Sequence, residues 1–115
     1  MGIKTPRVRI EPVLYISCGE ARIGSHGLVE ALKAIEETGS LRAAATRLGI
    51  NYRRLWARIR RAERLLGKQL VAGDKRGSRL TDEAKKIITA YEEALGRLRE
   101  AGLLQGVETS VDCKE

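Results

Sequence analysis

Apolar residues recur at helical spacing near the first third of the chain. Leu28, Leu32 and Ile35 follow one another at i, i+4 and i+7, which places them on one side of a helix. Gly39 follows the last of them, and a glycine is the residue that most readily takes the left-handed conformation at a helix C-terminus. The pattern therefore predicts an amphipathic helix of about three turns, closed at Gly39.

Two further helices are predicted directly after it. Ser40 is a suitable N-cap for a short helix over 41–48, and Asn51 is one for a longer helix over 52–66. The longer segment carries one apolar stripe and ends before Gly67. The members of that stripe are Leu55, Ile59, Ala62 and Leu66.

A short hairpin and a last helix are predicted next. The segment 69–80 contains two brief apolar runs on either side of a turn-forming tip, AGDKRG. Thr81 is an N-cap for a helix over 82–100, and Asp82 and Glu83 suit the positive end of the helix dipole. The apolar side of this helix holds Ala84, Ile87, Ile88, Tyr91, Leu95 and Leu98.

The two ends of the chain give weaker patterns. Residues 7–17 are rich in β-branched residues and predict a strand, in which Pro12 favours an edge or a bulge. With a short return strand at 21–23 this makes a hairpin over about 7–23. Residues 101–115 show no strong pattern, and we expect a flexible tail there. We thus expect one domain over 1–100.

Positive charge is concentrated in one part of the chain. The whole sequence has 22 Lys and Arg against 15 Asp and Glu, a formal net charge of +7. Between Ser40 and Arg79 there are 12 basic residues and 2 acidic ones. Since an excess of this kind favours a polyanionic partner, nucleic acid is the partner class that the charge predicts.

Length and composition exclude several classes of protein. The chain has 115 residues, 43% of them hydrophobic, which allows one folded domain but no apolar run long enough to span a bilayer. Its one His and two distant Cys residues, Cys18 and Cys113, lack the spacing of a metal site. No nucleophile–base pair or phosphate-binding loop is present. We therefore expect no enzyme, no metal, no cofactor and no membrane partner, and a cytoplasmic location.

The order of the predicted elements defines the expected fold. Two helices joined by a tight turn over 40–66 form a helix-turn-helix, and the basic hairpin 69–80 that follows is a wing. The fold class predicted is mainly α with small β-hairpins, a winged helix-turn-helix. The second of the two helices, Asn51–Leu66, is Arg-rich on the side opposite its apolar stripe, which suits entry into a DNA major groove.

The stretch ALKAIEETGSLRAAATRLGINYRRLWARIRRAERLLGKQLV, with RLTDEAKKII after the wing, resembles the DNA-binding domain of the molybdate-responsive regulator (ModE) family. The most specific motif is Tyr52-Arg53-Arg54-x-Trp56. More distantly the chain is similar to the N-terminal domain of LysR-type regulators. The resemblance implies DNA binding. We expect it not to extend to molybdate sensing, because these 115 residues are too few for a C-terminal oxyanion-binding domain as well, and no small-molecule effector is evident.

The predicted contacts with DNA follow from the docking geometry of such motifs. The helix over 52–66 is the expected recognition helix, and its start should meet base edges or phosphates. The basic residues of the helix over 41–48 and of the wing should meet the DNA backbone. For Arg54 an internal ion pair, and for Trp56 packing within the domain, remain alternatives. The DNA-binding set is Arg42, Tyr52, Arg53, Arg54, Trp56, Arg60, Lys75, Arg76 and Arg79.

The function predicted is that of a sequence-specific regulator of transcription that binds double-stranded DNA. A non-specific architectural nucleic-acid binder and a winged-helix module for protein interaction are the alternatives. The last helix predicts a homodimer, because its apolar stripe suits a second copy of the chain. The residues expected in that interface are Ile87, Ile88, Tyr91, Leu95 and Leu98.

Overall fold

The computed structural model describes residues 5–74 and 76–114. This part of the chain holds four α-helices and three pairs of antiparallel strands. The helices are α1 (His26–Thr38), α2 (Leu41–Leu48), α3 (Tyr52–Leu66) and α4 (Asp82–Glu100). The predicted class, mainly α with small β-hairpins in a winged helix-turn-helix, is confirmed.

The helices begin and end at the residues that the sequence indicates. Ser40 Oγ accepts a hydrogen bond from the backbone N–H of Ala43 at 3.3 Å, and Asn51 Oδ1 accepts one from the N–H of Arg53 at 2.7 Å. Thr81 caps α4 in the same way. Each such cap satisfies an N–H group that has no partner within the helix. The glycines that close α1, α2 and α3 are left-handed: Gly39, Gly49 and Gly67.

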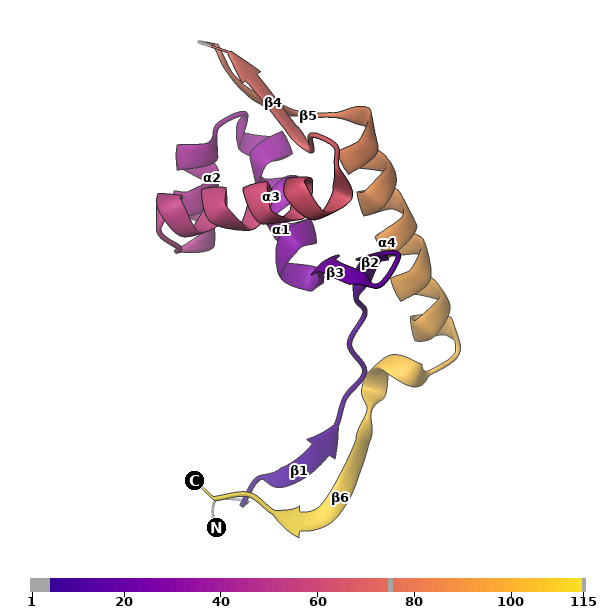
Figure 1. Ribbon diagram of the computed structural model, residues 1–115. Helices are drawn as coiled ribbons and strands as arrows, with labels where there is room; N and C mark the ends of the chain where they lie inside the picture. The colour runs from indigo at the N-terminus through magenta and orange to yellow at the C-terminus, as the bar shows by residue number, and fades with distance from the viewer. Residues whose placement is uncertain (1–4, 75, 115) are drawn as a thin grey trace.

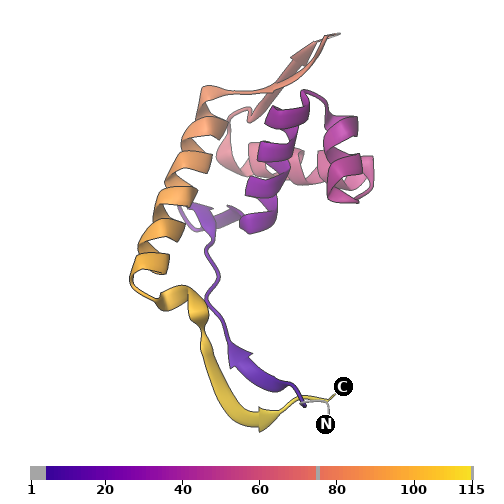
Figure 2. The same cartoon turned by 180° about the vertical axis from the view of Figure 1, so that it is seen from behind.

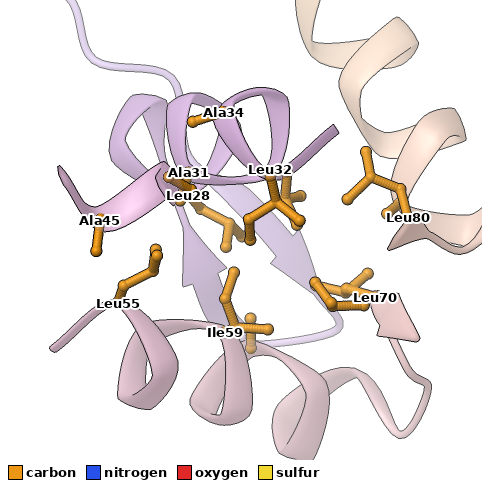
Figure 3. Packing of buried hydrophobic residues seen from close by; sticks show 14 of the residues in the cluster. Leu28, Ala31, Leu32, Ala34, Ala45, Leu55, Ile59, Leu70 and Leu80 are labelled. Atoms are coloured by element: carbon orange, nitrogen blue, oxygen red, sulfur yellow. The ribbon is translucent and has the colours of Figure 1, made fainter. Parts of the chain in front are cut away.

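The core lies where α1, α3 and the base of the wing meet (Figure 3). The side chains of Leu28 and Leu32 face those of Leu55 and Ile59, and all four are fully buried. Leu70 and Leu80 close the cluster from the wing side. On α2 the buried residues are Ala44 and Ala45, whose small side chains let α2 approach α1 closely.

The wing consists of β4 (Val71–Asp74) and β5 (Gly77–Leu80), paired with Val71 opposite Leu80. The expected hairpin over 69–80 is confirmed, although its first strand begins at Val71 rather than at residue 69. Ser78 donates its backbone N–H to the carbonyl oxygen of Gly39 at 2.8 Å. The wing is therefore hydrogen-bonded to the turn between α1 and α2.

The N-terminal hairpin is shorter than the sequence suggested. Only β2 (Ile16–Cys18) and β3 (Ala21–Gly24) pair with each other. The expected single strand over 7–17 is wrong, because the chain leaves extended pairing between Ile10 and Ile16 and the pyrrolidine ring of Pro12 cannot donate to a strand ladder. The first strand, β1 (Arg7–Ile10), takes a different partner.

That partner is the segment that we expected to be a flexible tail. After a short 3₁₀ turn, η1 (Leu103–Gln105), strand β6 (Val107–Asp112) pairs antiparallel with β1, with Ile10 opposite Val107. The expectation of a tail over 101–115 was therefore wrong. The sequence does contain a signal for strand β6, since Val107, Thr109 and Val111 alternate with polar residues, as in a strand with one apolar face.

The β1–β6 ribbon projects away from the helices, and its far end carries both chain ends (Figures 1 and 2). The structure measures 57 × 31 × 24 Å along its principal axes. The helix-turn-helix and the wing lie at the other end of the long axis. A basic surface on α3 is thus held well apart from the ribbon.

Candidate nucleic-acid interface

The N-terminal ends of α2 and α3 bring two of the predicted DNA-binding residues, Arg42 and Tyr52, into contact. The guanidinium carbon of Arg42 lies 4.7 Å from the centre of the Tyr52 ring, in a cation–π contact. Arg53 is the next residue on α3 and is exposed. Asn51 caps the first turn of α3 through the N–H of Arg53, which sets the position of this helix start.

A second group lies one turn further along α3, on the flank that faces the wing. The guanidinium carbon of Arg60 lies 4.5 Å from the centre of the Trp56 ring, and Arg60 Nη1 lies 3.4 Å from Glu63 Oε1. Trp56 is half-buried, so part of its ring packs within the domain and part stays accessible at the surface. A hollow of about 420 Å³ separates these residues from Gln69 and the strands of the wing.

The wing carries exposed arginines beyond that hollow. Arg79 is exposed on β5, and Arg76 is exposed at the tip, where its backbone N–H donates to Asp74 Oδ1 at 2.7 Å. This hydrogen bond is the Asx turn that the sequence AGDKRG favours. Lys75, the remaining predicted contact in the wing, lies outside the described residues.

Arg54 is placed apart from the other predicted residues. It lies on the flank of α3 that faces the start of α1, together with Arg58 and Arg61. The sequence prediction did not include Arg58 and Arg61. Their spacing from Arg54, at i+4 and i+7, is the signal that would have grouped the three.

The predicted dimer stripe on α4 is partly used within the chain. Ile87 and Ile88 pack against the core, and Tyr91 is only 9% exposed, with its ring centre 6.3 Å from that of His26. Tyr91 is therefore largely covered by the chain's own residues, while Ile87 and Ile88 are half-buried, and the expected interface stays a prediction. Leu95 and Leu98 remain half-buried.

Among residues 5–74 and 76–114, no three His, Cys, Asp or Glu side chains come together in a group able to hold a metal ion. No helix in these ranges combines the length and the apolar character needed to cross a membrane.

A helix-turn-helix with a basic helix, followed by a two-stranded wing with exposed arginines, defines a winged helix-turn-helix protein. The sequence model of the bacterial regulatory helix-turn-helix proteins of the lysR family matches residues 27–85, just over half of the chain. The chain belongs to this family. Comparison with curated protein sequences finds no significant match.

Several solved structures share the fold, among them CbnR, a LysR family transcriptional regulator. The complex of the CbnR DNA-binding domain with DNA matches with a TM-score of 0.56 and 24% identity, over 66% of this chain and 87% of that one. ArgP from Mycobacterium tuberculosis matches with a TM-score of 0.53 and 30% identity, over 64% of this chain and 28% of that one. Oxidized OxyR from Corynebacterium glutamicum matches with a TM-score of 0.53 and 23% identity, over 64% and 24%.

Most of these matches cover only a part of the matched protein. The chain spans about a quarter of the length of the longer regulators that it matches. At 23–24% identity the likeness to OxyR and CbnR is one of fold. The sequence analysis found two resemblances, and the family identified is the more distant one, the LysR-type regulators. The closer resemblance, to the molybdate-responsive regulators, receives no support from the comparisons.

Proposed function

We propose that this protein binds double-stranded DNA in a sequence-specific manner and regulates transcription, with α3 in the major groove. The observation that carries the proposal is the junction of α2 and α3, where the exposed Arg42 lies over the ring of Tyr52 and Arg53, the next residue on α3, is exposed. In helix-turn-helix proteins the N-terminal residues of the second helix meet the base edges. The concentration of positive charge between Ser40 and Arg79 supports the same partner.

Seven of the nine predicted residues take the following roles in this arrangement. Arg53 reads a base or grips a phosphate at the start of α3, and Arg42 contacts a phosphate from α2. Trp56 and Arg60 line the flank of α3 nearest the wing, where Arg60 neutralises a phosphate. The remaining basic residues act on the backbone near the wing: Lys75, Arg76 and Arg79. The motif Tyr52-Arg53-Arg54-x-Trp56 is the most specific feature of the resemblance to the molybdate-responsive regulators, and it concerns DNA binding alone.

The proposal includes a homodimer that acts on chromosomal DNA in the cytoplasm. The second half of α4 supplies the contact, since Leu95 and Leu98 stay half-buried in the single chain. Two copies of α3 would then read half-sites about one duplex turn apart, roughly 34–36 Å. Such an arrangement predicts a binding site with approximate two-fold symmetry.

The test starts from a pool of random duplexes from which the protein enriches the sequences that it binds. Affinity for the enriched duplex and for a scrambled duplex is then measured by fluorescence anisotropy over a series of salt concentrations. We expect a clear preference for the enriched duplex and a steep loss of affinity with salt, because bound arginines release counterions from phosphates. Arg99→Ala, a charge removed from the end of α4, is the control and should bind normally.

The two alternative functions give different results in the same experiment. Equal binding to both duplexes with strong salt dependence would identify a non-specific architectural protein. The absence of binding to any duplex at low salt would overturn the proposal. In that case the winged helix would have to act as a module for protein interaction.

A further inference from the structure

A surface pocket of about 510 Å³ lies between the start of α1 and the flank of α3 that faces away from the wing. Its α1 side is formed by Ser25 and Gly27, and its α3 side by Arg54, Arg58 and Arg61. The three arginines stand at i, i+4 and i+7, so they occupy one side of the helix. The pocket therefore collects three positive charges beside a helix start.

Unlike Arg47, Arg60 and Arg97, these three arginines have no acidic partner among the described residues. Arg47 and Arg97 lie 2.6 Å from Glu37 and Glu93 respectively. No Asp or Glu oxygen lies within 4.0 Å of the guanidinium groups that line the pocket. Three like charges on one side of a helix repel each other, and a bound anion would relieve that repulsion.

Arg58 contacts the start of α1 on one side of the pocket. Its Nη1 donates to the carbonyl oxygen of Gly27 at 3.4 Å. A Cβ at Gly27 would lie only 3.1 Å from the same nitrogen, so the absence of a side chain lets the guanidinium rest against α1. The remaining N–H groups of Arg58 are then left for another acceptor. An acceptor with several oxygen atoms suits such a fork.

We infer that this pocket binds a phosphate of the DNA strand opposite to the strand that the wing contacts. The inference rests on the proposed function and adds a second contact between α3 and the DNA backbone. The major groove is about 12 Å wide and an α-helix with its side chains is roughly 10–12 Å across, so both flanks of α3 would face a backbone. Trp56, Arg60 and the wing occupy one flank, and the pocket occupies the other.

The test compares Arg58→Gln/Arg61→Gln with the wild-type protein on the enriched duplex. We expect each lost contact to weaken binding roughly tenfold on enriched and scrambled duplexes alike, since phosphates carry no sequence information. The slope of log K against log salt should fall by about 2. Arg7→Gln/Arg9→Gln removes the same charge from the β1–β6 ribbon, far from α3, and should change neither quantity. An unchanged slope in the pocket variant, with circular dichroism showing a folded protein, would overturn the inference.

A neutral methylphosphonate, placed singly at each backbone position, identifies the phosphate itself. At the position that occupies the pocket, the substitution should weaken the wild-type protein but cause little further loss in the double variant. Purely additive losses at every position would overturn the assignment.

Inorganic phosphate tests the other source of the same chemistry. Melting temperatures are compared in phosphate and in chloride at equal ionic strength. Suppose that phosphate stabilises the wild-type protein but not the double variant, and that the double variant binds DNA as tightly as the wild type. The pocket then takes a free anion, and the DNA assignment is wrong. Failure of the proposed function is a separate result, because then the wild-type protein itself binds no duplex.

Discussion

Glu63 Oε2 accepts a hydrogen bond from the backbone N–H of Leu70 at 2.8 Å and another from that of Val71 at 3.2 Å. Glu63 is only 8% exposed, although the rest of the C-terminal part of α3 is rich in exposed charge. Its carboxylate thus joins the recognition helix to the first strand of the wing. The two elements that we expect to meet DNA are held in a fixed relation by one side chain.

Replacing this carboxylate should lower stability and loosen the wing. Glu63→Ala leaves two buried N–H groups without a partner, which should cost about 1–3 kcal/mol in the free energy of unfolding. Glu63→Gln keeps one amide oxygen as an acceptor and should lose less. Urea unfolding monitored by circular dichroism measures both. Equal stability of Glu63→Ala and the wild type would show that water replaces the carboxylate without loss.

Arg53→Ala tests how the start of α3 contacts DNA. If Arg53 reads a base, its loss should cost about 1–3 kcal/mol on the enriched duplex and relax the choice of sequence at one position. Anisotropy on a panel of duplexes with single base changes measures the preference at each position. A uniform loss on every duplex would show that Arg53 grips only a phosphate. Arg99→Ala, far from α3, serves as the matched control.

Substitution of two glycines by alanine should change the stability in opposite directions. Gly77 has a φ of +143°, and a Cβ there would lie 2.6 Å from the carbonyl oxygen of Gly39, so Gly77→Ala should strain the wing where it meets the α1–α2 turn. Gly96 lies within α4 with no atom near an added Cβ, so Gly96→Ala should raise stability by about 0.5–1 kcal/mol. Thermal unfolding of both variants decides the signs. A rise in the melting temperature of Gly77→Ala would contradict this account.

The second half of α4 should determine the oligomeric state. Leu98→Lys places a charge where we propose that two copies meet, and it should shift the protein from dimer to monomer in sedimentation equilibrium. Leu103→Lys is the control, because Leu103 is 57% exposed just beyond the end of α4. If both variants keep the sedimentation behaviour of the wild type, α4 is not the dimer contact.

The β1–β6 ribbon should be the least stable regular element of the single chain. A two-stranded ribbon is marginal in water, and here Ile10 and Val107 lie opposite each other while 61% and 67% exposed. Amide hydrogen exchange should therefore be much faster in 7–10 and 107–112 than in the buried turns of α1 and α3. Equal protection in a protein shown to be monomeric would contradict the prediction.

The helices were predictable from the sequence because their signals are local. Ser40, Asn51 and Thr81 each act on an N–H group two or three residues away, and the closing glycines act on the preceding turn. The apolar stripes of α1 and α3 depend only on spacing along one helix. The concentration of charge on and around α3, which predicts the class of partner, is likewise a property of the sequence.

The tertiary structure decided the features that depend on distant neighbours. Strand β1 pairs with β6 from the opposite end of the chain, and no local pattern specifies a partner so far away. Arg54, Arg58 and Arg61 meet the start of α1 only because α3 packs across it. Tyr91 and Glu63 are buried for the same reason: helical spacing shows which side a residue occupies, but only packing determines what covers that side.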